Sequence, residues 1–220
     1  PFDISSSDSY LSLYNPSLIY KINFIGDTLL KIDTKREILH HELTNDNNNN
    51  IIALTYEYKT FDLSNFGGGE KDSIKGDGLV VYDSSGKLVW KWNVFDHEDP
   101  LTYKNINSLK KDWTHGNGIG VTHDNNYVLS LRTLNQLWKI DSKSGRILWK
   151  LGLNGNIPIE ESSIFYAQHA IHEIGVDTFL LFDNGTRDER MISRALIFSM
   201  RDDQFKLLNA IELPKDLFSF

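Results

Sequence analysis

The chain has 220 residues, 40% of them hydrophobic and 12% aromatic, which is enough for a substantial packed core in one or two domains. Its formal net charge of −7, from 30 acidic and 23 basic residues, argues against a nucleic-acid partner, because phosphate contacts need a surplus of Lys and Arg. The absence of cysteine excludes disulfides and thiolate metal sites, and no run of about 18 apolar residues predicts a membrane span.

Short apolar runs with alternating polar residues, separated by turn residues, predict an all-β chain. Pairs of strands joined by a polar turn are expected, in chain order, at residues 18–32, 79–92, 137–150 and 195–208. In the two clearest copies the turn ends in Gly86 or Gly145, and glycine can adopt the positive φ that such hairpin loops require. The repeat of one hairpin type indicates a repetitive β architecture.

A second kind of segment begins at a histidine and leads, about ten residues later, into an apolar strand. The histidines are His41, His115 and His169, and the strands are expected at 51–55, 127–131 and 178–182. Together with the closing hairpin, each unit has about four strands, which is the blade of a β-propeller. Residues 61–76, with three consecutive glycines, are interpreted as an insertion.

Blades of about 40–50 residues predict three to four four-stranded antiparallel blades in this chain. We expect residues 1–220 to be a single β-propeller region and an arc of a longer ring, because so few blades leave sheet faces uncovered. A four-bladed or irregular propeller is the alternative. The start at Pro1 instead of Met agrees with a segment of a longer protein, and the Asn-rich residues 45–50 are expected to form an exposed loop.

Equivalent positions of successive blades lie on a ring around the axis of a propeller, so His41, His115 and His169 are expected to converge. Imidazoles can bind a metal, but only Glu42 accompanies them as a carboxylate. Arg132 ends the strand that follows His115, and its guanidinium suits a tetrahedral oxyanion. We therefore expect an anion site without a metal. Chance spacing of the histidines and an ordinary salt bridge of Arg132 are the alternatives.

Six segments, in the same order, resemble motifs of the bacterial arylsulfate sulfotransferases that use no nucleotide sulfate donor. They are residues 40–43 (HHEL), 112–119 (DWTHGNGI), 130–141 (SLRTLNQLWKID), 145–152 (GRILWKLG), 165–169 (FYAQH), and 182–185 with 193–195 (FDNG and SRA). Gly118 is a departure, since the family usually has Ser there. The resemblance implies a six-bladed ring, of which this chain would supply an arc.

The resemblance also implies a ping-pong reaction in which a histidine carries the sulfuryl group from an aryl sulfate to a phenol. The matching carrier is His169, and Arg132, His115 and Asn117 match residues that hold the sulfuryl oxygens. His41, preferred to His40 because its spacing to Leu43 matches that of His169 to Ile171, is expected to act as acid or base on the phenol oxygen. The residues expected to contact substrate are Asn117, His40, Gln168 and Tyr166.

The expected partners are small aryl sulfates and phenols, with no cofactor, no nucleic acid and no membrane span in this segment. The resemblance further implies a periplasmic or secreted protein, and a homodimer is the expected assembly. Two alternatives to a transferase remain: a propeller that only binds a ligand or a protein partner, and an aryl sulfate hydrolase in which water replaces the phenol.

Overall fold

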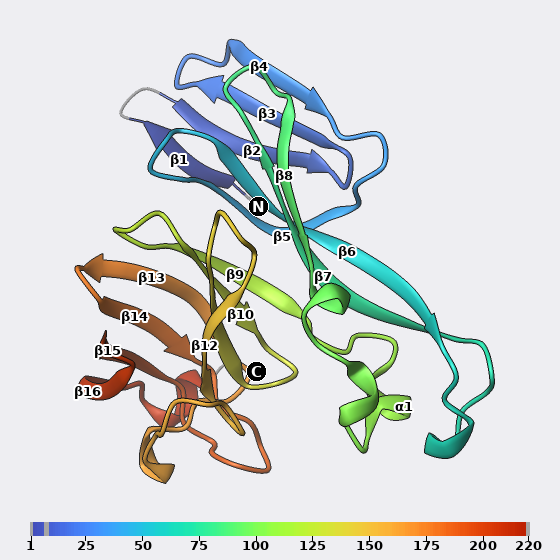
Figure 1. Cartoon of the computed structure of the whole chain (residues 1–220). Helices are drawn as coiled ribbons and strands as arrows, with labels where there is room; N and C mark the ends of the chain where they lie inside the picture. Colours follow the sequence, from blue (N-terminus) through green and yellow to red (C-terminus); the bar gives the residue numbers. More distant parts are fainter. Residues whose placement is uncertain (1, 7–8, 219–220) are drawn as a thin grey trace. The chain divides into compact units, whose positions relative to one another are not determined.

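The computed structural model describes residues 2–6 and 9–218. These residues form four antiparallel sheets of four strands each (Figure 1). Within every sheet, hydrogen-bonded neighbours follow one another along the chain. This up-and-down order is that of propeller blades, so the prediction of an all-β propeller is confirmed, with four blades in the chain.

The chain divides into two compact units, residues 1–116 and 117–220, called unit 1 and unit 2 below. The strands of unit 1 are β1 (Phe2–Ser6), β2 (Ser9–Asn15), β3 (Leu18–Asn23) and β4 (Thr28–Asp33) in one sheet, and β5 (Leu39–Asn45), β6 (Ile51–Phe61), β7 (Asp72–Tyr82) and β8 (Leu88–Asn93) in the next. The expectation of a single propeller region over residues 1–220 stays a prediction.

The other two sheets belong to unit 2, apart from Gly116, the first residue of β9, which is the last residue of unit 1. Their strands are β9 (Gly116–Val121), β10 (Tyr127–Leu131), β11 (Gln136–Ile140) and β12 (Ile147–Gly152), followed by β13 (His169–Gly175), β14 (Thr178–Asp183), β15 (Arg194–Arg201) and β16 (Gln204–Glu212).

Helical structure in the described residues is confined to one short α-helix and five single 3₁₀ turns. They are α1 (Ile106–Leu109), η1 (Ser64–Phe66), η2 (Val94–Asp96), η3 (Pro100–Thr102), η4 (Glu161–Ser163) and η5 (Lys215–Leu217). None of them has the length and apolar character that crossing a membrane would require.

The predicted hairpin turns owe their shape to an aspartate followed by a glycine. The carboxylate of Asp83 accepts the backbone N–H groups of Ser85 and Lys87, and Gly86 has a φ of 82°. Asp141 and Gly145 repeat this arrangement between β11 and β12, with a glycine φ of 74°. Both glycines thus occupy the left-handed conformation that the sequence predicted for them.

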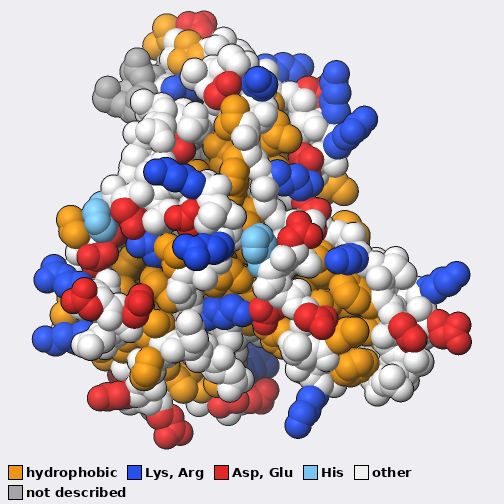
Figure 2. Space-filling view, in the orientation of Figure 1, with side chains coloured by type: hydrophobic (Ala, Val, Ile, Leu, Met, Phe, Trp, Pro, Cys, Tyr) orange, Lys and Arg blue, Asp and Glu red, His pale blue; other side chains and the backbone are white. Residues whose placement is uncertain are grey.

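Each unit has its own apolar core. The core of unit 1 contains buried residues of its two sheets: Leu11, Ile19, Ile32, Leu39, Leu43, Ile51, Ala53, Val80 and Tyr82. The core of unit 2 is richer in aromatic residues, and Phe179 stacks on Phe198 with ring centroids 5.5 Å apart. Acidic and basic side chains of the described residues are interspersed over the face shown in Figure 2. The exclusion of a nucleic-acid partner stays a prediction.

Candidate active site

The predicted site residues form one group in each unit. The unit 1 group contains His40, His41 and His115, with Tyr56, Asp77 and Asp112 as their partners. The unit 2 group contains Asn117, Arg132, Tyr166, Gln168 and His169, with Asn184 as a partner of His169.

In unit 1 the structure brings three histidines together. The rings of His41 and His115 lie with centroids 5.1 Å apart, and those of His40 and His41 lie 5.0 Å apart. His40 and His41 sit where the register of β5 against β6 shifts, between His40 and Leu43. The bulge lets two consecutive residues reach the same cluster, whereas consecutive residues of a regular strand point to opposite faces.

His40 and His41 differ strongly in burial. His40 is only 7% exposed and stacks on Tyr56, with ring centroids 3.8 Å apart and an interplanar angle of 4°. His41 is exposed. The sequence-based preference for His41 as the reacting side chain therefore has a structural counterpart, because a residue that meets a substrate needs access. Its reactive role stays a prediction.

Asp112 orients His115. Nδ1 of His115 is hydrogen-bonded to Oδ2 of Asp112, and Nζ of Lys75 lies 2.7 Å from Oδ1 of the same carboxylate. Burial by itself would raise the pKa of Asp112, but His115 and Lys75 outweigh it and hold that pKa far below its usual range. Because Asp112 is charged, Nδ1 of His115 carries the proton, and Nε2 is the nitrogen available for other contacts.

The backbone of both accessible histidines is in an unusual conformation. His41 has a φ of 48° and His115 a φ of 49°, in the left-handed region that non-glycine residues rarely adopt. Such a conformation costs about 1 kcal/mol or more per residue. Strain of this kind is concentrated at functional sites, which adds to the case for these two histidines.

In unit 2, His169 is the first residue of β13, and its Nδ1 is held by the protein. Nδ1 lies 3.1 Å from the carbonyl oxygen of Ala167 and 3.1 Å from Nδ2 of Asn184. Either Nδ1–H donates to the carbonyl, or Nδ1 accepts from the amide. In both cases Nδ1 is engaged with the protein, which directs bond formation to the other ring nitrogen, Nε2. Asn184 lies in the motif at residues 182–185, but the sequence did not indicate its contact with His169.

Gln168 and Asn117 form the buried support of this histidine. Gln168 is 0% exposed, and its Nε2 donates to Oγ of Ser130 and to the carbonyl of Gln136. Nδ2 of Asn117 donates to the carbonyl of Gln168 over 2.8 Å. The amide oxygens of Asn117 and Gln168 are buried and find no hydrogen-bond partner among the described residues. Their predicted contacts with substrate stay predictions.

Arg132 follows β10 directly and is half-buried. Its guanidinium makes no ion pair with any described residue, so the structure does not bear out the alternative of an ordinary salt bridge. Tyr166 is half-buried beneath the guanidinium of Arg190, which lies 5.5 Å from the ring centroid. Burial raises the pKa of its hydroxyl, so Tyr166 stays protonated and able to donate at neutral pH.

A buried ion cluster holds the segment that precedes His169. The carboxylate of Asp183 pairs with Nε of Arg194 at 2.8 Å and with Arg190, and it accepts the backbone N–H of Tyr166. The guanidinium of Arg194 also donates to the carbonyls of Ser162 and Ile164. This cluster explains the two separated motifs at residues 182–185 and 193–195, because their charged residues pair across β14 and β15.

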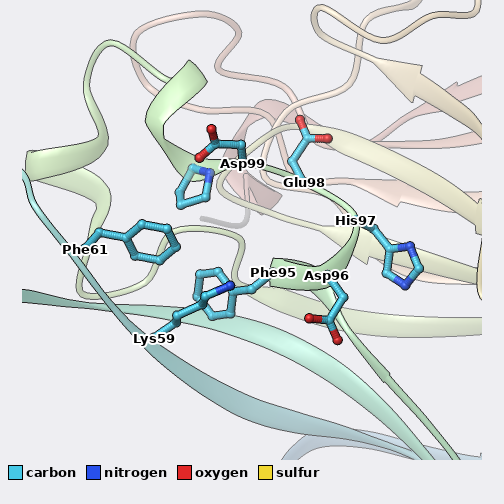
Figure 3. Close-up of a pocket in the computed structure, with 8 residues that line it drawn as sticks. Lys59, Phe61, Phe95, Asp96, His97, Glu98 and Asp99 are labelled. Atoms are coloured by element: carbon cyan, nitrogen blue, oxygen red, sulfur yellow. The ribbon is translucent and has the colours of Figure 1, made fainter.

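Outside these groups, a hollow with a volume of about 390 Å³ lies in unit 1 (Figure 3). Phe61 and Phe95 line it together with Lys59 and the polar segment that follows Phe95. It contains none of the predicted site residues. The two rings pack against each other at 5.7 Å, so much of their surface supports the insertion between β6 and β7.

A further group of metal-ligand types lies in unit 2, where His123, Glu173 and Asp177 offer atoms within 4.8 Å of one another. Both carboxylate oxygens of Glu173 are already engaged. They accept N–H groups from the backbone of His123 and Asp177 and from the His123 ring, whose Nδ1 is 3.0 Å away. We interpret the group as a tie between the turn after β9 and the turn after β13.

Replacing His123 by alanine is expected to weaken this tie only at low pH. The hydrogen bond to Glu173 raises the pKa of His123, so its contribution is fully present below the unfolded pKa of about 6.5 and disappears as pH rises through the folded pKa. The exposed pair limits the loss to about 1 kcal/mol or less near pH 5.5. Urea unfolding at that pH and near pH 9, with His172→Ala as control, measures it; an equal loss at both pH values would contradict the tie.

The chain matches the model of a known sequence family. The family model described as Arylsulfotransferase (ASST) matches residues 2–199. The chain belongs to this family. The resemblance found in the six motifs is thereby confirmed, and the predicted activity is supported at the level of the arylsulfotransferase family. A comparison with curated protein sequences finds no match for this arylsulfotransferase-family chain.

Solved structures similar to this arylsulfotransferase-family chain share its fold at low identity. One is a protein of unknown function from Bacteroides caccae, with 9% identity and a TM-score of 0.57, covering 96% of this chain and 59% of that protein. Another is an auxiliary nutrient binding protein from Bacteroides ovatus, with 7% identity and a TM-score of 0.53, covering 97% and 41%. The chain thus spans less than two thirds of either protein.

Proposed function

We propose that this protein transfers a sulfuryl group from an aryl sulfate to a phenol, with a sulfohistidine at His169 as the intermediate. Family membership supports the reaction class. The observation that carries the choice of residue is the environment of His169, whose Nδ1 is held by Ala167 and Asn184, which directs bond formation to Nε2. A neutral imidazole is nucleophilic near pH 7 without a separate base.

In the first half-reaction, Nε2 of His169 attacks the sulfur, and the bond between sulfur and the aryl oxygen breaks. The electron pair of that bond stays on the oxygen, which takes a proton from protonated His41 and leaves as a phenol. The ring of His169 then carries a positive charge, and its Nδ1–H can donate to the carbonyl of Ala167, 3.1 Å away.

In the second half-reaction, the acceptor phenol gives its proton to the now neutral His41, and its oxygen attacks the sulfur. The bond between nitrogen and sulfur breaks, and its electrons return to Nε2 of His169. Proton and charge therefore balance over the cycle, because His41 returns to its protonated state.

Negative charge on the sulfuryl oxygens requires donors. Arg132 supplies a guanidinium without an ion-pair partner among the described residues. Asp112 binds Nδ1 of His115, so Nε2 is the nitrogen of that ring that can face the sulfuryl group. His115 is then a donor when its ring is protonated. Removing one such prepositioned donor typically costs about 3–4 kcal/mol of barrier stabilisation. We propose these two side chains, with Asn117, as the oxyanion donors.

The function is tested with p-nitrophenyl sulfate in the presence and absence of phenol. We expect nitrophenol release to depend on the acceptor, with phenyl sulfate as the second product. Without a phenol, the sulfuryl group stays on His169 and blocks a further turnover. Release that is equal with and without phenol would instead indicate the hydrolase, and no release would indicate the ligand-binding or interaction propeller. Nitrophenol absorbance together with chromatography of phenyl sulfate distinguishes the three outcomes.

A further inference from the structure

Asp77 and His40 are two buried polar residues that the proposed chemistry does not use. Asp77 is 1% exposed and lies on β7, and His40 lies on β5. Oδ1 of Asp77 and Nε2 of His40 are 3.1 Å apart, within ion-pair distance but out of line for a hydrogen bond, and neither has another partner among the described residues. A buried group without a partner costs about 1–3 kcal/mol, so each atom needs the other.

The other oxygen of Asp77 is fully engaged. Oδ2 accepts the hydroxyl of Thr114 and the backbone N–H of Gly116, the residues on either side of His115. This pair of donors fixes the orientation of the carboxylate and leaves Oδ1 as the oxygen that faces His40. The negative charge of a carboxylate oxygen at 3.1 Å favours the proton of the neutral His40 ring on Nε2, so that Nδ1 of His40 carries a lone pair.

The lone pair on Nδ1 of His40 determines the state of the next ring. Nδ1 of His40 and Nδ1 of His41 are 2.8 Å apart, which is hydrogen-bond distance. One of the two nitrogens must donate and the other accept, because two lone pairs or two N–H groups would repel each other. With His40 as the acceptor, His41 carries its proton on Nδ1, and Nε2 of His41 is its proton-accepting nitrogen.

We propose that Asp77 and His40 are positioning residues that form a relay, in which the carboxylate fixes the tautomer of His40 and His40 fixes that of His41. The stacking of Tyr56 on His40, with an interplanar angle of 4°, fixes the orientation of the middle ring. When Nε2 of His41 takes a proton, the positive charge faces a neutral ring that is backed by a carboxylate. This inference rests on the proposed function, since it assigns the source of the basicity of His41.

The orientation of Asp77 makes Asp77→Asn a sharp test. In this variant the amide oxygen must face the donors of Thr114 and Gly116, so the amide NH₂ group must face Nε2 of His40. That nitrogen then becomes an acceptor, the proton of His40 moves to Nδ1, and the proton of His41 moves to Nε2. The analogous Asp→Asn change in serine proteases preserves geometry and lowers turnover about 10⁴-fold through the wrong tautomer.

The direct measurement is two-bond ¹H–¹⁵N correlation NMR of the whole chain, at a pH where both imidazoles are neutral. We expect the wild-type protein to carry protons on Nε2 of His40 and Nδ1 of His41, and Asp77→Asn to exchange both. The matched control is Asp72→Asn, the same change on the same strand, where the carboxylate binds Lys110 and Gly69 instead. It is expected to retain the wild-type pattern.

Kinetic measurements on Asp77→Asn provide a second test of the relay. With p-nitrophenyl sulfate, whose leaving group needs little protonation, Asp77→Asn should still release a burst of nitrophenol, while transfer to phenol falls by about 10²–10⁴-fold. A wild-type His40 protonated on Nδ1, or a folded Asp77→Asn with unchanged tautomers, would overturn the relay. If Asp77→Asn does not fold, the wild-type tautomers alone decide. A wild-type protein without burst or transfer would contradict the proposed function, while the NMR result would still decide the relay.

Discussion

Replacing His169 by alanine is expected to abolish sulfuryl transfer, with a fall in turnover of about 10⁴-fold or more, because removal of a covalent nucleophile removes the whole two-step route. Within the described part of unit 2, His169 is the histidine whose Nδ1 is held by a backbone carbonyl and an amide. Among the described residues of unit 2, the remaining histidines are His123, which is tied to Glu173, and His172, which is exposed.

Two measurements check this result. Steady-state transfer from p-nitrophenyl sulfate to phenol gives the loss in turnover, and mass spectrometry of protein incubated with the donor alone detects the gain of one sulfuryl group. The control is His172→Ala, three residues further along β13, which should retain both signals. Transfer that persists in His169→Ala, or a sulfuryl group found on another peptide, would show that the nucleophile is misassigned.

Much of the fold was predictable from the sequence because each blade repeats a local signal. The Asp and Gly turn residues at 83–86 and 141–145 adopt a hairpin geometry that depends on nearby residues alone. The predicted insertion at 61–76 was less accurate. Strands β6 and β7 extend into it and pair as far as Phe61 and Asp72, but residues 57–60 are mostly exposed and lack the apolar alternation that would have indicated a strand.

The histidines of the candidate site were identifiable from their repeated position, but their partners were not. Asp77 reaches Thr114 across 37 positions of sequence, and only the register of β7 and the fold of the following loops bring them together. Asp112 is three residues from His115, yet outside a helix this spacing has no fixed meaning. The strained backbone of His41 and His115 also depends on tertiary structure, since a positive φ is uncommon for a non-glycine residue and is not indicated by the residue type alone.

Replacing Asp183 by alanine is expected to lower the free energy of unfolding by about 3–5 kcal/mol, the range for breaking a buried ion pair by removing one partner. Asp183 is 0% exposed and is the shared partner of Arg190 and Arg194. Without it, the guanidinium of Arg194, itself buried, keeps its bonds to backbone carbonyls but loses its counter-charge. Urea unfolding followed by tryptophan fluorescence measures the loss, with the exposed Asp188→Ala as the control.

The same substitution should also reduce transfer, because Asp183 accepts the backbone N–H of Tyr166, three residues before His169. Asp183→Asn separates the two effects. Its amide keeps one acceptor, which can remain bonded to Tyr166, but it loses the charge that pairs with two arginines. We therefore expect Asp183→Asn to be destabilised and yet to retain more transfer activity than Asp183→Ala under conditions in which both are folded. Equal transfer in the two variants would show that the Tyr166 bond does not position His169.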